Sequence, residues 1–171
     1  YIFFNNQCGI ITCPESFAIE FSDRHKGIGG DGIVLIEESK IADAKMRIFN
    51  IDGSEGKMAG NSIRCVGKYL YDNKIVDKTE IDIETASGIR HLSLYTRNGK
   101  VSSVTVDMGK AELKPNHIPV RLDGESVINR PVTINGEEVH ISCCSVGNAH
   151  CVVFVDNVDK VDVSKIGPQF E

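Results

Sequence analysis

One stretch of the chain, residues 46–71, constrains the fold more than any other, because a strand, a turn and a helix follow one another in it. Its apolar start predicts a strand over 46–50. The Asp-Gly-Ser sequence at 52–54 predicts a turn, since glycine supplies backbone freedom and Asp and Ser favour turns. A helix is predicted from about residue 60, and we expect Asn73 to end it in the left-handed conformation. The buried face of this helix has apolar or small residues at helical spacing: Ile63, Val66, Gly67 and Leu70.

The start of this helix is a candidate binding site. Free backbone N–H groups and the positive end of the helix dipole collect at residues 58–62, which suits an anion such as a carboxylate. The side chains of Asn50 and Asn61 can add hydrogen-bond donors and acceptors beside Gly60. The alternative is that Asn50 only shapes the turn and Asn61 only caps the helix. The residues alone favour this alternative.

Strands are predicted in most of the remaining chain. The first part of the chain has an apolar strand at 1–5, a short element of uncertain type at 17–21 and a buried strand at 33–37. Alternating residues predict a β-meander with strands at 80–85, 90–96 and 100–108, joined by a hairpin turn at Asn98-Gly99. Residues 111–119 are expected to form a linker. A second hairpin is predicted over 131–134 and 138–146, followed by a buried strand at 151–155.

These elements predict an α/β protein of the α+β type with two domains. We place the boundary near residues 110–114, so that the first domain spans 1–112 and the second, expected to be incomplete, spans 113–171. Because the chain begins at Tyr1, without an initiator methionine, we expect it to be a piece of a longer protein.

Composition excludes several classes of function. The formal net charge is −5 and the basic residues are scattered, which disfavours nucleic-acid binding. No apolar run approaches the roughly 18 residues of a membrane span. The sequence shows no basic–apolar–small leader pattern, so we do not expect secretion. The six cysteines lack metal-binding or redox spacing, so we expect reduced thiols, mostly buried, in a cytoplasmic protein. No cluster of metal ligands is apparent.

The glycine-rich loop at 27–32 matches a dinucleotide-binding pattern literally. That pattern must follow a strand and open a helix, whereas here it precedes the strand at 33–37. We therefore expect a structural loop, which the preceding residues Asp23, Arg24 and His25 support. Arg64 is expected to pair with an acid such as Glu55.

Five segments together resemble the diaminopimelate epimerase family in order and spacing. They are DRHKGIGGDG at 23–32, NIDGSE at 50–55, AGNSIRC at 59–65, VTVDMG at 104–109 and SVGNAHC at 145–151. One position departs from the family pattern. The family has a catalytic cysteine immediately before the Gly-Asn pair, and this chain has Ala59 there.

The resemblance implies a fold of two similar halves, with mixed and antiparallel sheets around a central helix and the second half incomplete here. It implies inversion of LL-diaminopimelate to the meso form by two thiols without a cofactor, in lysine and peptidoglycan precursor synthesis. It assigns Asn50, Gly60, Asn61 and Asn148 to the substrate, and His150 to assist the first thiol. The second cysteine is expected beyond residue 171. The resemblance also implies a homodimer.

Ala59 can neither take nor give a proton, so the chain is expected to be inactive as it stands. Two explanations remain open: an alanine introduced to disable the site, which the intact flanking motifs favour, or a native alanine in a divergent member. Two alternative functions also remain open. One is a related racemase of another amino acid, such as histidine or proline, and the other is a non-catalytic amino-acid-binding homologue. For His150, the residues alone favour a partly buried histidine at a strand start.

Overall fold

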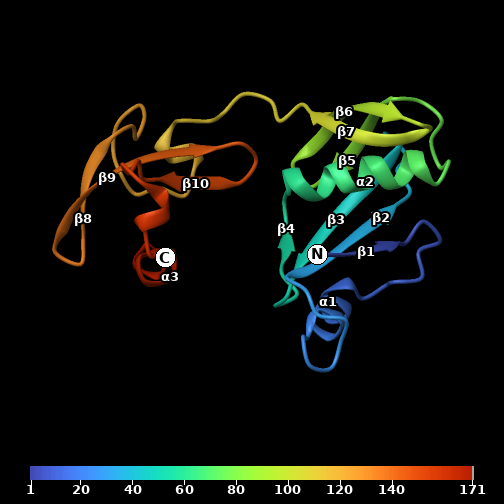
Figure 1. Cartoon of the computed structure of the whole chain (residues 1–171), viewed down its shortest axis with the longest axis horizontal. Helices are drawn as coiled ribbons and strands as arrows, with labels where there is room; N and C mark the ends of the chain where they lie inside the picture. The colour runs from blue at the N-terminus through green and yellow to red at the C-terminus, as the bar shows by residue number, and fades with distance from the viewer. Residues whose placement is uncertain (171) are drawn as a thin grey trace. The chain divides into compact units, whose positions relative to one another are not determined.

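The computed structural model describes residues 1–170 and divides into two compact units, Tyr1–Met108 and the residues from Gly109 onward. The first contains two helices and seven strands (Figure 1). In chain order they are β1 (Ile2–Asn5), α1 (Pro14–Ser22), β2 (Gly32–Glu37), β3 (Ala44–Asn50), β4 (Glu55–Gly56), α2 (Gly60–Asp72), β5 (Glu80–Thr85), β6 (Gly88–Arg97) and β7 (Lys100–Val106).

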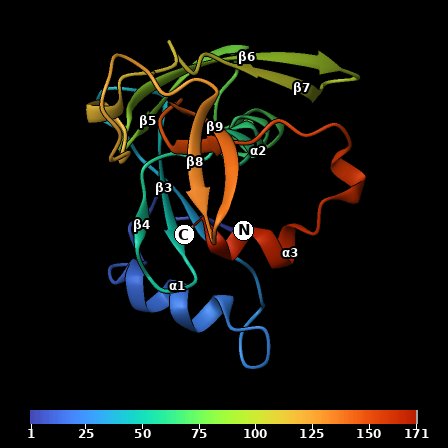
Figure 2. The same cartoon turned by 90° about the vertical axis from the view of Figure 1, so that its left-hand side faces the viewer.

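The seven strands form one mixed sheet in the order β1-β2-β3-β5-β6-β7, and the short β4 runs beside β3 (Figure 2). The pairs β1–β2 and β3–β5 are parallel, whereas β2–β3, β5–β6 and β6–β7 are antiparallel. The predicted meander of β5, β6 and β7 is confirmed. Its turn has positive φ at both Asn98 (54°) and Gly99 (74°), as a tight hairpin requires.

Helices cover both faces of the sheet where β2 and β3 lie. In β2, Ile33 and Leu35 pack in an apolar cluster with Ala18 of α1, while Val34 and Ile36 pack in the cluster that contains the buried face of α2. Successive strand residues point to opposite faces, so α1 and α2 cover opposite faces. This explains why residues 33–36 are continuously apolar, as in strands buried on both sides.

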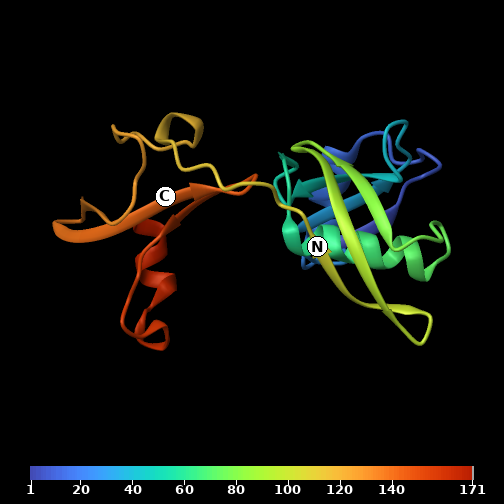
Figure 3. The ribbon, with the colours of Figure 1, turned by 90° about the horizontal axis from the view of Figure 1, so that it is seen from above.

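The central helix α2 packs on β5 and β6 through its small residue Gly67. A Cβ atom at position 67 would lie 2.8 Å from Leu92 Cδ2 and 3.1 Å from Leu94 Cδ2. Seen from above, β6 and β7 cross over α2 (Figure 3). The predicted buried face of the helix is confirmed. The expected left-handed end at Asn73 is wrong: Asn73 has φ −95°, and the next residue, Lys74, has φ 59°.

Residues 17–21, of uncertain type in the sequence, belong to α1. Pro14 opens this helix, where its missing N–H costs nothing. Phe17 and Phe21 stack with ring centroids 4.1 Å apart, and Phe4 of β1 meets Phe17 edge-on at 4.9 Å. These three rings hold α1 against the edge of the sheet.

The second unit contains a three-stranded antiparallel sheet in the order β10-β9-β8. Its elements are η1 (Pro115–His117), β8 (Arg130–Ile134), β9 (Glu137–Ser145), β10 (Ala149–Val152), η2 (Val158–Lys160), α3 (Val163–Ile166) and η3 (Gly167–Gln169). The predicted hairpin of β8 and β9 is confirmed, with a turn at Asn135-Gly136. The predicted buried strand at 151–155 is wrong. β10 ends at Val152 with all four of its residues exposed, and Phe154, which lies beyond the strand, is 82% exposed.

The expected linker at 111–119 is partly built into the second unit. Glu112 forms a β-bridge with Ser145, and Ile118 is buried in a small core with Val127, Ile141 and Cys143. The Glu112 carboxylate accepts hydrogen bonds from the Lys114 N–H and from His117, and these lower its pKa to about 2. None of the helices described over residues 1–170 is long and apolar enough to cross a membrane.

A prediction follows for Gly32, where the glycine loop enters β2 beside β3. Its φ is +145°, and a Cβ atom there would lie 2.1 Å from the Phe49 carbonyl oxygen. We expect Gly32→Ala to lower the free energy of unfolding by more than about 2 kcal/mol, measured by urea denaturation.

The matched control is Gly88→Ala. Gly88 also has positive φ (+97°), but a Cβ atom there meets nothing within 4 Å. Backbone strain alone should then cost about 1 kcal/mol. Equal losses in the two variants would show that the close approach of β3 to Gly32 does not matter.

Candidate functional site

The turn after β3 is closed by its own backbone and side chains. The Asn50 N–H donates to the Ser54 carbonyl oxygen (2.8 Å), and the Gly53 N–H donates to the Asn50 carbonyl oxygen (2.9 Å). Gly53 has φ +84°, so glycine suits this position. Asp52 Oδ1 accepts from the Ser54 hydroxyl (2.6 Å) and N–H (2.9 Å), and these bonds lower the pKa of Asp52. The predicted turn is confirmed.

The Asn50 side chain is held in one orientation at the end of β3. Its Oδ1 accepts from the Tyr1 hydroxyl (3.2 Å), and its Nδ2 donates to Ser54 Oγ (3.0 Å). An amide has a second N–H and a second lone pair, so Asn50 keeps capacity for one more donor and one more acceptor bond. Asn50 thus shapes the turn, as the alternative interpretation holds, and remains able to contact a ligand.

Glu55 of β4 ties the motif to β3. Its carboxylate accepts two hydrogen bonds from Arg47, at 2.8 Å from Nε and 2.9 Å from Nη2. The Arg47 guanidinium also lies over the Phe49 ring, 4.8 Å from its centroid. The Arg47 side chain lowers the pKa of Glu55. The expected pairing of Glu55 with Arg64 is therefore wrong, because the register of β3 and β4 brings Arg47 beside Glu55 instead.

The first turn of α2 presents backbone donors. The first intrahelical bond runs from the Ile63 N–H to the Ala59 carbonyl oxygen (3.0 Å). The N–H groups of residues 60–62 therefore precede the hydrogen-bonded ladder of the helix, and no acidic residue lies in the first turn. This is the electrostatic setting that favours an anion.

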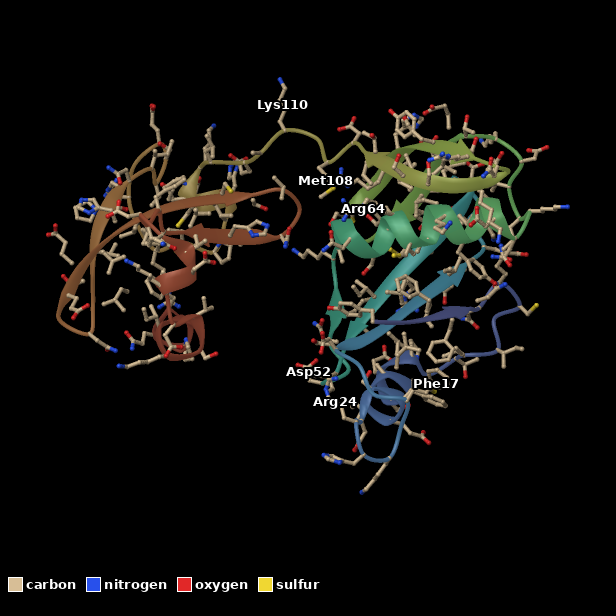
Figure 4. All side chains as sticks on the ribbon, viewed as in Figure 1. Phe17, Arg24, Asp52, Arg64, Met108 and Lys110 are labelled. Atoms are coloured by element: carbon tan, nitrogen blue, oxygen red, sulfur yellow. The ribbon has the colours of Figure 1, made fainter. Side chains whose placement is uncertain are left out.

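Asn61 is not the helix cap that the alternative interpretation expected. Ala59 occupies the N-cap position with extended geometry (φ −140°, ψ 107°) and makes no side-chain capping bond. Asn61 lies inside the first turn, where its Oδ1 accepts a hydrogen bond from the Arg64 guanidinium. Arg64 and Met108 lie near this end of α2 (Figure 4). Asn61 and Arg64 also line an open groove of about 430 Å³ between α2 and β7.

Ala59 and Gly60 join this helix start to the core of the first unit. Ala59 is partly buried and packs against the cluster that contains Ile63 and Val66. A Cβ atom at Gly60 would lie 3.8 Å from the Met108 Cε and Sδ atoms, an ordinary contact. Position 59 thus presents a methyl group beside the free N–H groups, with no ionisable atom of its own.

Asn148 and His150 lie in the second unit, at the turn from β9 into β10. Gly147 has φ +102°, and the Val146 N–H donates to the Asn148 carbonyl oxygen (3.2 Å). His150 Nε2 lies 3.1 Å from Asn148 Oδ1, so the two side chains form a hydrogen-bonded pair. Both residues are exposed, so the partly buried histidine of the alternative interpretation is not observed.

The glycine loop before β2 has structural contacts. Asp23 Oδ1 accepts from the N–H groups of His25 (2.7 Å) and Lys26 (2.9 Å), and Arg24 pairs with Asp31 at 2.6 Å. A Cβ atom at Gly27 would lie 2.4 Å from the Glu20 carbonyl oxygen. These contacts fit the structural role predicted for the loop and its preceding residues.

The six cysteines are all free thiols. Only Cys143 is buried, Cys144 is half-buried, and the other four are exposed: Cys8, Cys13, Cys65 and Cys151. The expectation of mostly buried cysteines is wrong, because four of them lie on loops, on the outer side of α2 or on the edge strand β10.

Three contacts at the candidate site were missed by sequence reasoning: the Tyr1 hydroxyl on Asn50, the Arg47 pair with Glu55, and Met108 against Gly60. Tyr1 and Met108 come from distant parts of the chain, so only the strand order places them here. The Arg47 contact could have been predicted from the sequence, since Arg47 and Glu55 lie on either side of the predicted turn at 52–54, which brings the chain on its two sides together.

Comparison with known proteins decides the family. The model of the family described as diaminopimelate epimerase matches residues 1–114, which is more than half of the chain. The chain belongs to the diaminopimelate epimerase family. This family consists of epimerases that work without pyridoxal phosphate, so the chain is related to isomerases.

Curated relatives match most or all of the chain. A diaminopimelate epimerase of Agathobacter rectalis is 50% identical over 165 residues, covering 92% of this chain and 58% of the relative. Those of Acetivibrio thermocellus and Methanococcus maripaludis are 48% and 47% identical over 171 residues, covering 61% and 62% of their own lengths. The chain thus spans about three fifths of the length of the relatives it matches.

Solved structures share the fold. A hydroxyproline epimerase from Agrobacterium vitis matches with a TM-score of 0.61 at 19% identity, covering 87% of this chain and 40% of that one. A probable proline racemase from Agrobacterium radiobacter also has a TM-score of 0.61, at 20% identity, with coverage of 90% and 41%. The predicted mixed α/β fold of the diaminopimelate epimerase type is confirmed.

A pH prediction follows for Glu55. Because its pKa is lower in the folded than in the unfolded chain, the stabilisation from the Arg47 pair is complete above the unfolded value and is lost as pH falls through the folded value. We expect Glu55→Gln to cost about 0.5–1 kcal/mol at pH 7, discounted for partial exposure. The difference from the unmodified chain should shrink below about pH 4.

The measurement is urea unfolding from pH 7 down to acid. Glu38→Gln is the matched control, since the described residues give Glu38 no ion pair. A Glu55→Gln deficit that stays constant with pH would rule out the ion pair as its cause.

Proposed function

We propose that this chain is the part of a diaminopimelate epimerase that binds the amino-acid end of the substrate. The observation that carries the proposal is the start of α2, where the free N–H groups of residues 60–62 lie next to the Asn61 side chain. An α-carboxylate needs such donors, and no acidic side chain in the first turn competes with it. The family membership supports diaminopimelate as the amino acid.

In this proposal, the residues that contact the substrate are Asn50, Gly60, Asn61 and Asn148. His150 assists proton transfer, because an imidazole ring can both accept and donate a proton. Its exposed position and its hydrogen bond to Asn148 support a role at the surface of a site. No cofactor or metal takes part.

The reaction of the family requires two thiols on opposite faces of the α-carbon. One thiolate removes the α-proton, and the other thiol delivers a proton from the far side. A helix N-terminus favours the first step because it lowers the pKa of a thiol and stabilises negative charge that develops on the carboxylate. With Ala59 at that position, the chain binds the substrate and cannot complete the inversion.

The two units are proposed to be the first epimerase domain (1–112) and the beginning of the second (113–171). The proposed boundary lies a few residues after the division between the two compact units, at Met108/Gly109. We further propose a cytoplasmic homodimer in the synthesis of lysine and peptidoglycan precursors.

The curated relatives favour diaminopimelate over another amino acid. Six curated diaminopimelate epimerases are 46–50% identical to this chain. The hydroxyproline epimerase and the probable proline racemase are only 19–20% identical and share the fold alone. Ala59 also fits a non-catalytic amino-acid-binding protein. The experiment below distinguishes such a protein from an epimerase.

The test is solvent deuterium exchange at the α-carbon of LL-diaminopimelate in heavy water. It uses the gene product that contains these 171 residues, unmodified and as Ala59→Cys. We expect the cysteine variant to incorporate deuterium and form the meso isomer, and the unmodified protein to do neither. Ala59→Ser is the control, because it adds a side chain of similar shape whose hydroxyl is a far weaker acid than a thiol. If diaminopimelate binds and the cysteine variant is still silent, the epimerase proposal fails and a binding protein is favoured.

A second prediction concerns Asn50. Asn50→Asp places a negative charge where the substrate carboxylate is proposed to lie, while the Tyr1 hydroxyl can still donate to the new carboxylate. We expect diaminopimelate affinity, measured by calorimetry, to fall at least about tenfold, or about 1.4 kcal/mol. Asn73→Asp at the other end of α2 is the control and should leave affinity unchanged. Equal affinities in both variants would exclude Asn50 from the site.

A further inference from the structure

Two cysteines face each other across the edge of the second sheet. Cys143 of β9 and Cys151 of β10 are direct partners in the antiparallel register. Antiparallel partners point to the same face of a sheet, so the two thiols lie on the same side. The neighbouring pair, Cys144 and His150, points to the other side.

The backbone bonds show which kind of pair this is. The Cys143 N–H donates to the Val127 carbonyl oxygen (2.8 Å), and Ser145 exchanges hydrogen bonds with Glu112. These bonds point away from β10, so Cys143 and Cys151 form a non-hydrogen-bonded pair, in which the Cα atoms lie about 4.5 Å apart. A disulfide requires Cα atoms about 4.4–6.8 Å apart. The ladder therefore places the two residues within disulfide range without moving the backbone.

The surroundings of the two thiols differ. Cys143 is 4% exposed and packs in the small core with Ile118, Val127 and Ile141, whereas Cys151 is exposed. Burial raises the pKa of Cys143, and the adjacent Cys151 side chain contributes to the same shift. A reagent from solvent therefore meets Cys151 first, and Cys143 is the thiol behind it.

We propose that Cys143 and Cys151 form a reversible cross-strand disulfide by exchange with a low-molecular-weight disulfide. The Cys151 thiolate attacks one sulfur of that disulfide, which breaks its S–S bond and releases one thiol. Cys143 then gives up its proton and attacks Cys151 Sγ in the mixed disulfide, and the second thiol leaves. In total, two protein thiols lose two protons and two electrons, and the small disulfide is reduced to two thiols.

The disulfide closes a loop that contains Asn148 and His150, the two candidate site residues of this unit. It also fastens β10, which pairs with β9 alone. Restricting this short loop lowers the conformational freedom of the turn between the strands. The inference is independent of the proposed function, because it rests on the register of the hairpin and the positions of its thiols.

The test treats the chain with glutathione disulfide, blocks remaining thiols with an alkylating reagent and analyses tryptic peptides by mass spectrometry without reduction. Trypsin yields one peptide, residues 122–160, that holds Cys143, Cys144 and Cys151. The informative variant is Cys144→Ser, a change at a half-buried position. It leaves the two proposed partners, Cys143 and Cys151, as the only cysteines in this peptide.

We expect the Cys144→Ser peptide to lose the mass of two hydrogen atoms and to resist alkylation until a reductant is added. The matched double variant, Cys143→Ser with Cys144→Ser, should instead retain one glutathione on Cys151. Two outcomes would overturn the proposal. One is a Cys144→Ser peptide that remains alkylated at both cysteines, and the other is one that stops at a glutathione adduct without closing the loop.

Discussion

The antiparallel pairing of β2 with β3 is the constraint on which the first unit depends. It joins Gly32 to Asn50 at one end and Glu37 to Lys45 at the other, in unbroken register. Because β2 and β3 are buried on both faces, a shift of one residue would move each apolar side chain to the wrong cluster. Gly32 lets the two backbones approach at the end where the candidate site lies, since any Cβ there would overlap the Phe49 carbonyl oxygen.

The same pairing explains why the site lies at this place. β3 ends at Asn50, and hydrogen bonds between Asp52 and Ser54 close the turn. Glu55, after the turn, pairs with Arg47 of β3, so the chain is fixed on both sides of the turn. α2 then starts on the core through Ala59 and is held along its length by Gly67 against Leu92. The backbone N–H groups at the helix start are thus positioned by a strand, an ion pair and a packed helix.

Much of this arrangement could be predicted from the sequence, because local patterns specify local elements. The continuous apolar run at 33–36 and the spacing of Ile63, Val66 and Leu70 predicted the central strands and helix correctly. Predictions that needed the neighbours of an element failed. The apolar residues at 151–155 predicted a buried strand, yet burial depends on a covering layer that no local pattern encodes. The expected pairing of Arg64 with Glu55 is wrong for the same reason, because strand pairing brings Arg47 close to Glu55 instead.

Ala59 separates two properties that usually occur together at a helix start. The free N–H groups belong to the backbone, and Ala59 keeps the extended N-cap geometry without a side-chain bond. Under the proposed function, replacing a thiol by a methyl group at this position removes the proton carrier and leaves the donors for the carboxylate in place. Anion binding then depends on how β3 and α2 are packed, whereas proton transfer by the first thiol depends on a side chain at position 59 that the fold does not need.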